Sequence, residues 1–217
     1  KVLLGKSKAV SIVRNRQTSY CCPVCKRDNV NFNRFPYYFF RQWDKNQYIH
    51  SIFQKETFNI VFYSCSFCGS SDRDRLYALY FDKRVKENEN KYKLLDIAPS
   101  KPLSSFLKSC SNIEVRTADL YMEGVDDNVD ITNMANYADE RFDIFICSHV
   151  LEHVEDDIAA MKELFRVLAK GGWGIAMVPI DLALKEVYEN PAITDEAGRW
   201  KHFGQNDHVR MYSKEGF

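Results

Sequence analysis

The spacing of hydrophobic positions changes near residue 90 and divides the chain into two parts. Beyond this point, short apolar runs alternate with stretches in which apolar residues recur every three or four positions. Short apolar runs are typical of buried strands, and the longer spacing is typical of amphipathic helices. Strands that alternate with helices predict a parallel sheet covered by helices on both faces. We therefore expect an α/β domain with a doubly wound sheet over residues 90–217.

The predicted sheet has five strands, which we place at residues 94–97, 113–117, 128–131, 142–147 and 175–178. A helix follows the first strand. A second helix runs over residues 158–168 and stops at Gly171 and Gly172, because glycine suits a left-handed helix cap. In open sheets of this kind, ligands bind beyond the carboxyl ends of the strands. The residues that directly follow each strand therefore form the candidate site.

The earlier part of the chain, residues 20–81, is rich in aromatic residues and has no long helical period. It is bracketed by two Cys-x-x-Cys pairs, Cys22 with Cys25 and Cys65 with Cys68. This spacing lets two thiolates from one turn bind the same ion, and two such pairs complete a tetrahedral shell. We therefore predict a structural zinc ion in a module over residues 1–85, which includes a connecting helix.

Other interpretations of the cysteines remain open. The four can be unrelated buried residues, or one pair can be a redox motif, although such a motif usually begins a helix after a strand. Cys21 adjoins the first pair and can replace Cys22 as a ligand. The polar stretch 86–93 reads as a helix end or a solvated connection between the two parts.

Two features of the module point to ligands or to packing. The aromatic run 35–40 either stacks on a base or sugar, or packs a small module that has little other core. Arg73 and Arg75 follow the second cysteine pair. They either meet an anionic ligand or form salt bridges at the surface.

Composition and charge narrow the classes of protein that fit this pattern. Thirty Lys and Arg offset thirty Asp and Glu, which argues against the basic footprint of many nucleic-acid binders. The apolar runs are too short for a membrane span, and the start KVLLGKSK has too short an apolar run for a secretion signal. Paired cysteines in an ordinary globular composition favour a reducing compartment, so we expect a cytoplasmic protein. Because the chain begins at Lys1 and ends at Phe217 in what reads as a further element, we expect both ends to be incomplete.

The residues around the fourth predicted strand carry a family resemblance. The strand 142–147 leads into the residues VLEHV at 150–154, and the helix after it ends in LAKGG at 168–172. With these motifs, residues 94–180 resemble a class I S-adenosylmethionine-dependent methyltransferase, near the broad type 11 group. The upstream cysteine pairs followed by GSS-x-R-x-R resemble bacterial proteins in which a cysteine-rich module precedes such a domain. The resemblance implies a Rossmann-like sheet, S-adenosylmethionine as cofactor and methyl transfer as the activity.

The resemblance also implies a cofactor site along the strand ends. The family's first motif is rich in glycine, whereas here Asp96 is followed by Ala98 and Pro99, which predicts a stiffer loop set farther from the ligand. Asp119 matches the acidic residue that binds the ribose hydroxyls, and Asp130 matches the residue that meets the adenine amino group. The complete implied set is Asp96, Ala98, Pro99, Asp119, Leu120, Asp130, Ile131 and Ser148. For the three aspartates, a strand-end cap, a turn or a solvated acidic loop is the alternative role.

The candidates for catalysis are His149, His153 and His208. A histidine suits the role of general base when the methyl acceptor is a hydroxyl. We expect His149 to face the acceptor, because a parallel strand delivers its next residue to the ligand edge; a histidine bonded inside the core is the alternative. The sequence His149-x-x-Glu152-His153 also resembles the metal-binding pattern of some hydroxyl methyltransferases, with the first Glu replaced. His202 or His208 would complete such a site.

Three functions fit these features. The leading hypothesis is a methyltransferase acting on a small molecule or a glycan precursor, with the mildly acidic residues 182–199 as a cover over the substrate. An RNA base methyltransferase with a zinc module is the second, but the balanced charge and acidic cover lead us to expect no nucleic-acid partner. The third is a binding protein that has lost methyl transfer, suggested by the glycine-free first motif. The sequence leaves the methylated atom and the oligomeric state open.

Overall fold

The protein is organised around a five-stranded sheet in which every pair of neighbouring strands is parallel. The computed structural model describes residues 20–85 and 90–217, so the start of the predicted zinc module and part of the predicted connection at 86–93 lie outside the described residues. The strands are β3 (Tyr92–Ile97), β4 (Ile113–Asp119), β5 (Asp127–Asn128), β6 (Phe142–Ser148) and β7 (Leu168–Met177). Their order in the sheet is β5-β4-β3-β6-β7. The α/β fold with a mostly parallel central sheet, expected from the hydrophobic pattern, is confirmed.

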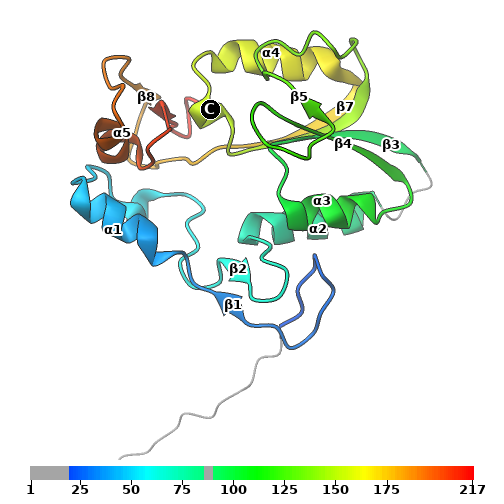
Figure 1. Cartoon of the computed structure of the whole chain (residues 1–217), viewed down its shortest axis with the longest axis horizontal. Coiled ribbons are helices and arrows are strands. Elements are labelled where there is room, and N and C mark those ends of the chain that lie inside the picture. Colours follow the sequence, from blue (N-terminus) through cyan, green and yellow to red (C-terminus); the bar gives the residue numbers. More distant parts are fainter. Residues whose placement is uncertain (1–19, 86–89) are drawn as a thin grey trace, which may run out of the picture.

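Helices cover both faces of this sheet (Figure 1). On one side lie α2 (Asp72–Arg84) and α3 (Lys101–Lys108), and on the other lies α4 (Asp157–Val167). Successive residues of β3 point to opposite faces, so Leu94 packs in the core under α2 and α3 while Leu95 packs in the core under α4. Both leucines are fully buried. The sheet therefore forms the middle layer of three.

The third predicted strand and the second predicted helix have different ends in the structure from those expected. The third strand is not at 128–131: β5 ends at Asn128, because the carboxylate of Asp130 accepts hydrogen bonds from the backbone N–H and hydroxyl of Thr132 and turns the chain. The helix predicted to reach Gly171 ends at Val167, and β7 begins at the next residue. Gly171 does take a positive φ of 78°, but inside the irregular start of β7, where the pairing register with β6 shifts.

The N-terminal segment contains β1 (Phe32–Asn33), α1 (Tyr37–Lys45), the short 3-10 helix η1 (Ile52–Gln54) and β2 (Ser64–Cys65), which pairs antiparallel with β1. It runs directly into α2 through a capping box. Ser71 accepts a hydrogen bond from the Asp74 N–H, and the Asp74 carboxylate accepts one from the Ser71 N–H. Arg75 is buried and donates to the backbone carbonyls of Tyr63 and Ser70. The expected surface salt bridge or ligand contact of Arg75 is therefore wrong, because its guanidinium holds the loop between β2 and α2.

The C-terminal segment returns to meet the N-terminal segment. It contains β8 (Tyr188–Glu189), α5 (Glu196–Phe203) and β9 (Arg210–Met211), with β8 and β9 antiparallel. The rings of Tyr38 and Phe39 on α1 each lie 6.1 Å from the ring of Trp200 on α5. Within residues 20–85 and 90–217, no helix has the length and apolar character that crossing a membrane requires. α1 of the N-terminal segment and α5 of the C-terminal segment thus pack against each other.

Candidate active site

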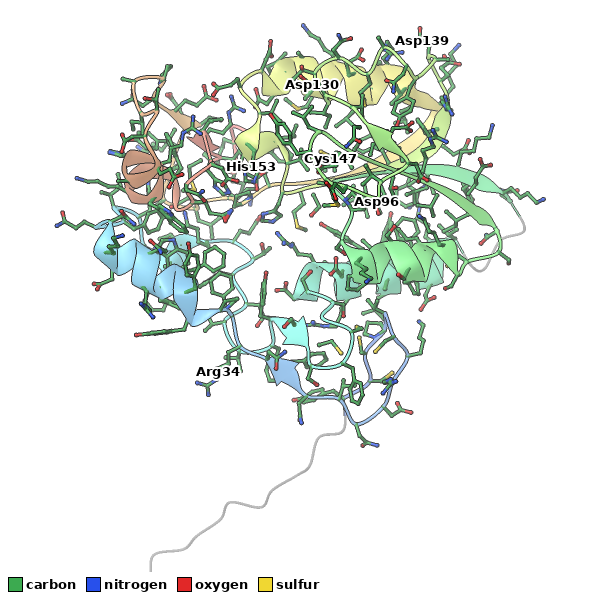
Figure 2. All side chains as sticks on the ribbon, in the orientation of Figure 1. Arg34, Asp96, Asp130, Asp139, Cys147 and His153 are labelled. Atoms are coloured by element: carbon green, nitrogen blue, oxygen red, sulfur yellow. The ribbon has the colours of Figure 1, made fainter. Side chains whose placement is uncertain are left out.

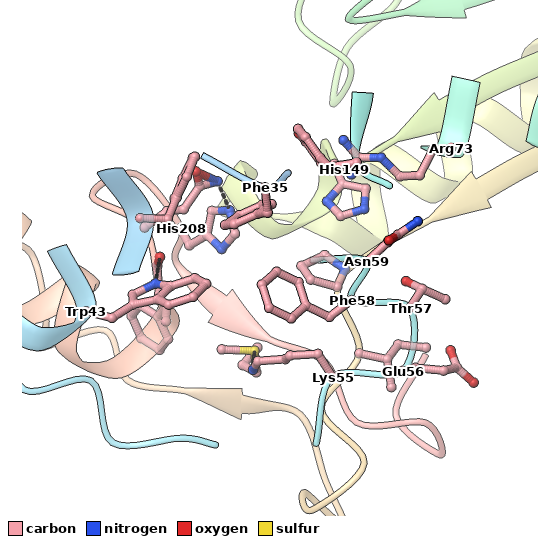
Figure 3. Close-up of a pocket in the computed structure, with 18 of the residues that line it drawn as sticks. Phe35, Trp43, Lys55, Glu56, Thr57, Phe58, Asn59, Arg73, His149 and His208 are labelled. Atoms are coloured by element: carbon pink, nitrogen blue, oxygen red, sulfur yellow. Dashed lines mark hydrogen bonds between the residues drawn. The ribbon is translucent and has the colours of Figure 1, made fainter. Parts of the chain in front are cut away.

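A cavity of about 320 Å³ lies where the strand ends meet these two segments (Figure 3). Its walls come from three parts of the chain. The residues that follow β6 and β7 contribute His149, His153, Pro179 and Ile180. The N-terminal segment and the start of α2 contribute Phe35, Phe39, Trp43, Tyr48, Lys55, Glu56, Thr57, Phe58, Asn59, Tyr63, Asp72 and Arg73. The C-terminal segment contributes Phe203, Gly204, Gln205, His208 and Met211.

Aromatic rings build the wall formed by the N-terminal segment. The ring of Trp43 stacks between Phe35 and Tyr48, with ring centroids 5.9 Å and 5.7 Å away. Its indole N–H donates to the backbone carbonyl of Gly204 at 2.8 Å, which ties this wall to the C-terminal segment. The aromatic run at 35–40 therefore does more than pack its own module. It contacts α5 and presents Phe35 and Phe39 to the cavity.

Charged groups of both signs reach the cavity. The Lys55 ammonium donates to the fully buried carboxylate of Asp181 at 3.0 Å, and the His50 ring lies 3.5 Å from the same carboxylate. Burial lowers the pKa of Lys55, although Asp181 works against that shift. Arg73 lies beside His149 on the other side of the cavity (Figure 3). Nothing in the sequence marked Lys55 or Trp43 as site residues, since both come from a segment without a recognisable motif.

The predicted catalytic histidines all line this cavity. His149 follows β6 in a left-handed conformation with φ of 57°, and its backbone N–H donates to the carbonyl of Met177 at 2.7 Å. His153 ends the short 3-10 helix η2 (Leu151–His153), and His208 comes from the loop between α5 and β9. Burial lowers the pKa of His149, and burial lowers the pKa of His208 to about 4. Burial also opposes the charged form of His153, but Asp207 beside it raises its pKa above the usual value.

Glu152 lies behind these histidines and is fully buried. Its carboxylate oxygen Oε1 is 3.1 Å from His149 Nδ1. Burial favours the neutral form of Glu152, yet His149 beside it holds its pKa below the usual range. The buried guanidinium of Arg210 donates to the carbonyls of Leu151 and Glu155, which fixes the turn that carries Glu152. His149 borders the cavity, whereas Glu152 does not.

The strand ends that the family resemblance assigned to the cofactor lie on the other side of β6. Asp96 is buried at the end of β3 (Figure 2), and burial together with the nearby Asp74 raises its pKa to about 7. One of its oxygens, Oδ2, has no hydrogen-bond partner. Ala98 takes the positive φ of 50° that glycine usually supplies, and its N–H donates to the carbonyl of Ala118. The loop therefore adopts a left-handed turn without glycine.

The remaining candidates for cofactor contact differ in exposure. Asp119 Oδ1 accepts hydrogen bonds from the backbone N–H groups of Tyr121 and Met122, which leaves its second oxygen for a ligand. Leu120 is exposed and Ile131 is buried in the core beneath α4. The hydroxyl of Ser148 lies 2.9 Å from the hydroxyl of Tyr77 on α2. Pro99 lies in the turn between β3 and α3, next to Ser100, which caps α3.

The expected cover over the substrate is wrong in its position. Residues 182–199 do not line the cavity, which is closed instead by residues 203–211 and by the N-terminal segment. Part of this segment instead forms β8, which pairs antiparallel with β9. The acidic residues of 182–199 therefore do not set the charge of the cavity.

The four cysteines of the two pairs come together away from this cavity. Their sulfur atoms all lie within 4.8 Å of one another. Cys22 is buried in this cluster, whereas Cys21 is exposed and its thiol points to a backbone carbonyl. The hydroxyl of Ser70 approaches the sulfurs of Cys22 and Cys68. Of the two adjacent cysteines, Cys22 is the member of the cluster.

Comparison with known proteins gives a family for part of the chain. Residues 105–176 match the model of a methyltransferase domain. No curated protein matches the chain. Among solved structures, it is similar to a S-adenosylmethionine-dependent methyltransferase from Archaeoglobus fulgidus, at 15% identity over 69% of this chain and 66% of that one, with a TM-score of 0.45.

Two further structures are similar over a smaller region. A putative methyltransferase from Bacillus halodurans matches at 23% identity over 58% of this chain and 55% of that one, with a TM-score of 0.38. The [4+2]-cyclase SpnF matches at 20% identity over 44% of this chain and 41% of that one, with a TM-score of 0.37. The matched region covers 41% of the cyclase, 55% of the Bacillus halodurans protein and 33% of DszA carbon methyltransferase, a further similar structure. The chain therefore matches about half or less of the length of these proteins. By the family match at residues 105–176, this chain contains a methyltransferase domain.

Proposed function

We propose that this protein transfers a methyl group from S-adenosylmethionine to a small molecule or a glycan precursor held in the cavity. The observation that carries the proposal is the position of the cavity, which has His149 and aromatic rings at the carboxyl end of β6, within a methyltransferase domain. Ligands of open parallel sheets bind at this edge. The proposed cofactor position and the proposed acceptor position are thus neighbours on opposite sides of β6.

The residues at the ends of β3 and β4 fit a cofactor that carries an ammonium group and a ribose. The buried Asp96 carboxylate has an oxygen without a partner, which suits a donor such as an ammonium. Asp119 keeps one oxygen for a ribose hydroxyl. When bound, S-adenosylmethionine supplies a methyl group on a positively charged sulfur. Leu120, Asp130, Ile131 and Ser148 stay proposed contacts on the strength of the family resemblance.

The chain's own residues would then orient the acceptor and take up its proton. The rings of Phe35, Trp43 and Phe58 exclude water and offer flat faces to a sugar or another ring. His149 Nε2 is buried without a hydrogen-bond partner, and burial keeps the ring neutral near pH 7, so it can accept a proton from a hydroxyl. Most of the rate gain in such a transfer comes from alignment of the acceptor with the methyl group.

We also propose that Cys22, Cys25, Cys65 and Cys68 bind one structural zinc ion. Thiolates about 2.3 Å from a tetrahedral zinc ion lie about 3.8 Å apart. The sulfurs of Cys22 and Cys68 are 3.8 Å apart, and all four belong to one cluster. The ion would anchor the proposed module over residues 1–85. Because cysteines stay reduced in the cytoplasm, we also propose a cytoplasmic location.

Calorimetric titration with S-adenosylmethionine and S-adenosylhomocysteine tests the proposed function most directly. We expect both to bind the wild-type chain at one site. Pro99→Gly offers a matched probe of the first motif, because it relaxes the loop without touching the cavity. If neither compound binds wild type or this variant, the protein is a binding protein without transfer activity. Tight, salt-sensitive RNA binding would instead favour an RNA substrate.

A further inference from the structure

We propose that Glu152, His153 and His208 form a second metal site, which binds a divalent transition-metal ion at the wall of the cavity. One ligand atom from each of these three residues lies within 4.8 Å of the others. The three come from different parts of the fold, because η2 supplies Glu152 and His153 while the loop before β9 supplies His208. One carboxylate with two imidazoles is a ligand set that suits a divalent transition metal.

The burial of Glu152 is the strongest sign that a cation belongs here. Its side chain has no exposed surface, and neither carboxylate oxygen has a hydrogen-bond partner. His149 Nδ1 approaches Oε1 to 3.1 Å, but without the geometry of a hydrogen bond. A buried charge that lacks such partners is strongly unfavourable. The guanidinium of Arg210 lies nearby, but its N–H groups donate to backbone carbonyls and to Glu189 rather than to Glu152.

Neighbouring residues already orient the two imidazoles. Asp207 lies 3.2 Å from His153 Nδ1, which leaves Nε2 as the free nitrogen of that ring. Gln205 lies 2.7 Å from His208 Nε2, and the other nitrogen, Nδ1, is buried without a partner. Ligating histidines commonly have their second nitrogen held in this way by a carboxylate or a polar group. The two rings meet edge to face with centroids 4.6 Å apart, so their free nitrogens can bind the same ion.

The site is separate from the cysteine cluster and differs from it in chemistry. The cysteine cluster offers four soft thiolates, whereas this site offers nitrogen and oxygen ligands. His153 and His208 both line the cavity, so an ion between them would have open positions toward an acceptor molecule. Closed shells are typical of structural ions, and open positions are typical of ions that bind substrate.

An ion in this place would bind the acceptor through a hydroxyl oxygen. This role rests on the proposed methyl transfer, whereas metal binding itself does not. A metal-bound hydroxyl loses its proton more readily. The oxygen then forms a bond to the methyl carbon, the carbon–sulfur bond breaks with its electron pair staying on sulfur, and the hydroxyl proton passes to His149 Nε2. The acceptor class that this site favours is therefore an alcohol or a sugar.

Binding of Mn²⁺ and of Zn²⁺ to the full chain, without any methyl donor, tests the site. The protein is first loaded with one zinc equivalent, and added Mn²⁺ is followed by electron paramagnetic resonance, because Mn²⁺ prefers nitrogen and oxygen ligands to thiolates. We expect one further ion per chain. His153→Ala, which changes a partly exposed residue, and Glu152→Gln, which keeps the shape of the side chain, should each weaken this binding by about 100-fold or more.

His202→Ala is the matched control, because His202 lies in the same C-terminal segment but bonds Tyr188 instead of joining the cluster. It should bind the second ion as wild type does. Asp207→Asn should weaken binding by about 10–100-fold, since it removes the charge behind His153. The site is refuted if neither Mn²⁺ nor Zn²⁺ binds beyond the first equivalent, or if His153→Ala and His202→Ala bind it equally. A bound ion with no methyl transfer would leave the site standing and reject only the proposed function.

Discussion

The two sides of β6 are built in different ways. On the side of β3 and β4, Asp119 is held by a local turn, in which its carboxylate accepts from the N–H groups of Tyr121 and Met122. On the side of β7, the cavity brings together residues as distant in sequence as Phe35, His149 and His208. The first side depends on short segments of chain, and the second depends on the whole fold. Changes on the first side should therefore stay local, and changes on the second should affect elements that are far apart in sequence.

The largest effect is expected for the cysteine cluster of the N-terminal segment. Cys65→Ser should lower the zinc content by one equivalent per chain and reduce the melting temperature sharply, because a structural zinc site contributes roughly 10 kcal/mol or more. Elemental analysis and calorimetry measure both. Cys21→Ser is the matched control and should change neither, since Cys21 is exposed outside the cluster. Full zinc content in Cys65→Ser would contradict the assignment.

The next largest effect is expected at His149. His149→Ala should lower kcat by about 10²–10⁴-fold through loss of the general base, while the affinity for S-adenosylmethionine stays near wild type. Steady-state kinetics with an accepted alcohol substrate and calorimetry separate the two quantities. An equal loss of cofactor affinity would show that the two sides of β6 are not independent.

A smaller effect is expected at the ribose position. Asp119→Ala should weaken S-adenosylmethionine binding by about 1.5–3 kcal/mol for each charge-assisted bond lost. Asp119→Asn separates the local turn from the ligand, because its amide oxygen can still accept from Tyr121 and Met122 while the charge is removed. Unchanged affinity in both variants would mean that another carboxylate binds the ribose.

The smallest effect is a dependence of stability on pH at Asp96. Its pKa in the folded chain is about 7, above the ordinary value of 3.8, so the folded state binds more protons than the unfolded state between these limits. The free energy of unfolding should therefore fall as pH rises from about 4 to above 7. Asp96→Asn should come close to wild type near pH 4 and be more stable by about 1–4 kcal/mol at pH 8 in the absence of cofactor. Denaturant titrations at the two pH values measure the free energy of unfolding. An equal dependence on pH in wild type and Asp96→Asn would contradict a raised pKa of Asp96.

Sequence reasoning succeeded where a local pattern fixes the structure. The alternation of apolar runs located β3, β4, β6 and α4 because the strands and helices of a three-layer sheet carry different periods. The cysteine spacing identified the cluster, and the position of His149 after β6 identified a residue of the cavity. Each of these depends on residues that are close in sequence.

It failed where distant segments decide the outcome. The cavity wall of Trp43 and Lys55 had no motif, because its role follows from contacts with Gly204 and Asp181 more than 100 positions later. The expected cover at 182–199 was misplaced because the β8–β9 pairing could not be read from two-residue strands. Gly171 looked like a helix cap, yet β7 already begins at Leu168. No local period records such pairings.

The contact between Trp43 and Gly204 has a consequence for synthesis on the ribosome. The aromatic segment around Trp43 leaves the ribosome long before residues 203–211, which complete the cavity, have been made. During that interval its rings cannot pack against α5, so they expose hydrophobic surface to other nascent chains. The cysteine cluster, in contrast, is complete once Cys68 has emerged. Early capture of zinc would hold the segment in a compact form until the end of the chain arrives, so that shortage of zinc during translation should appear first as aggregation of unfinished protein.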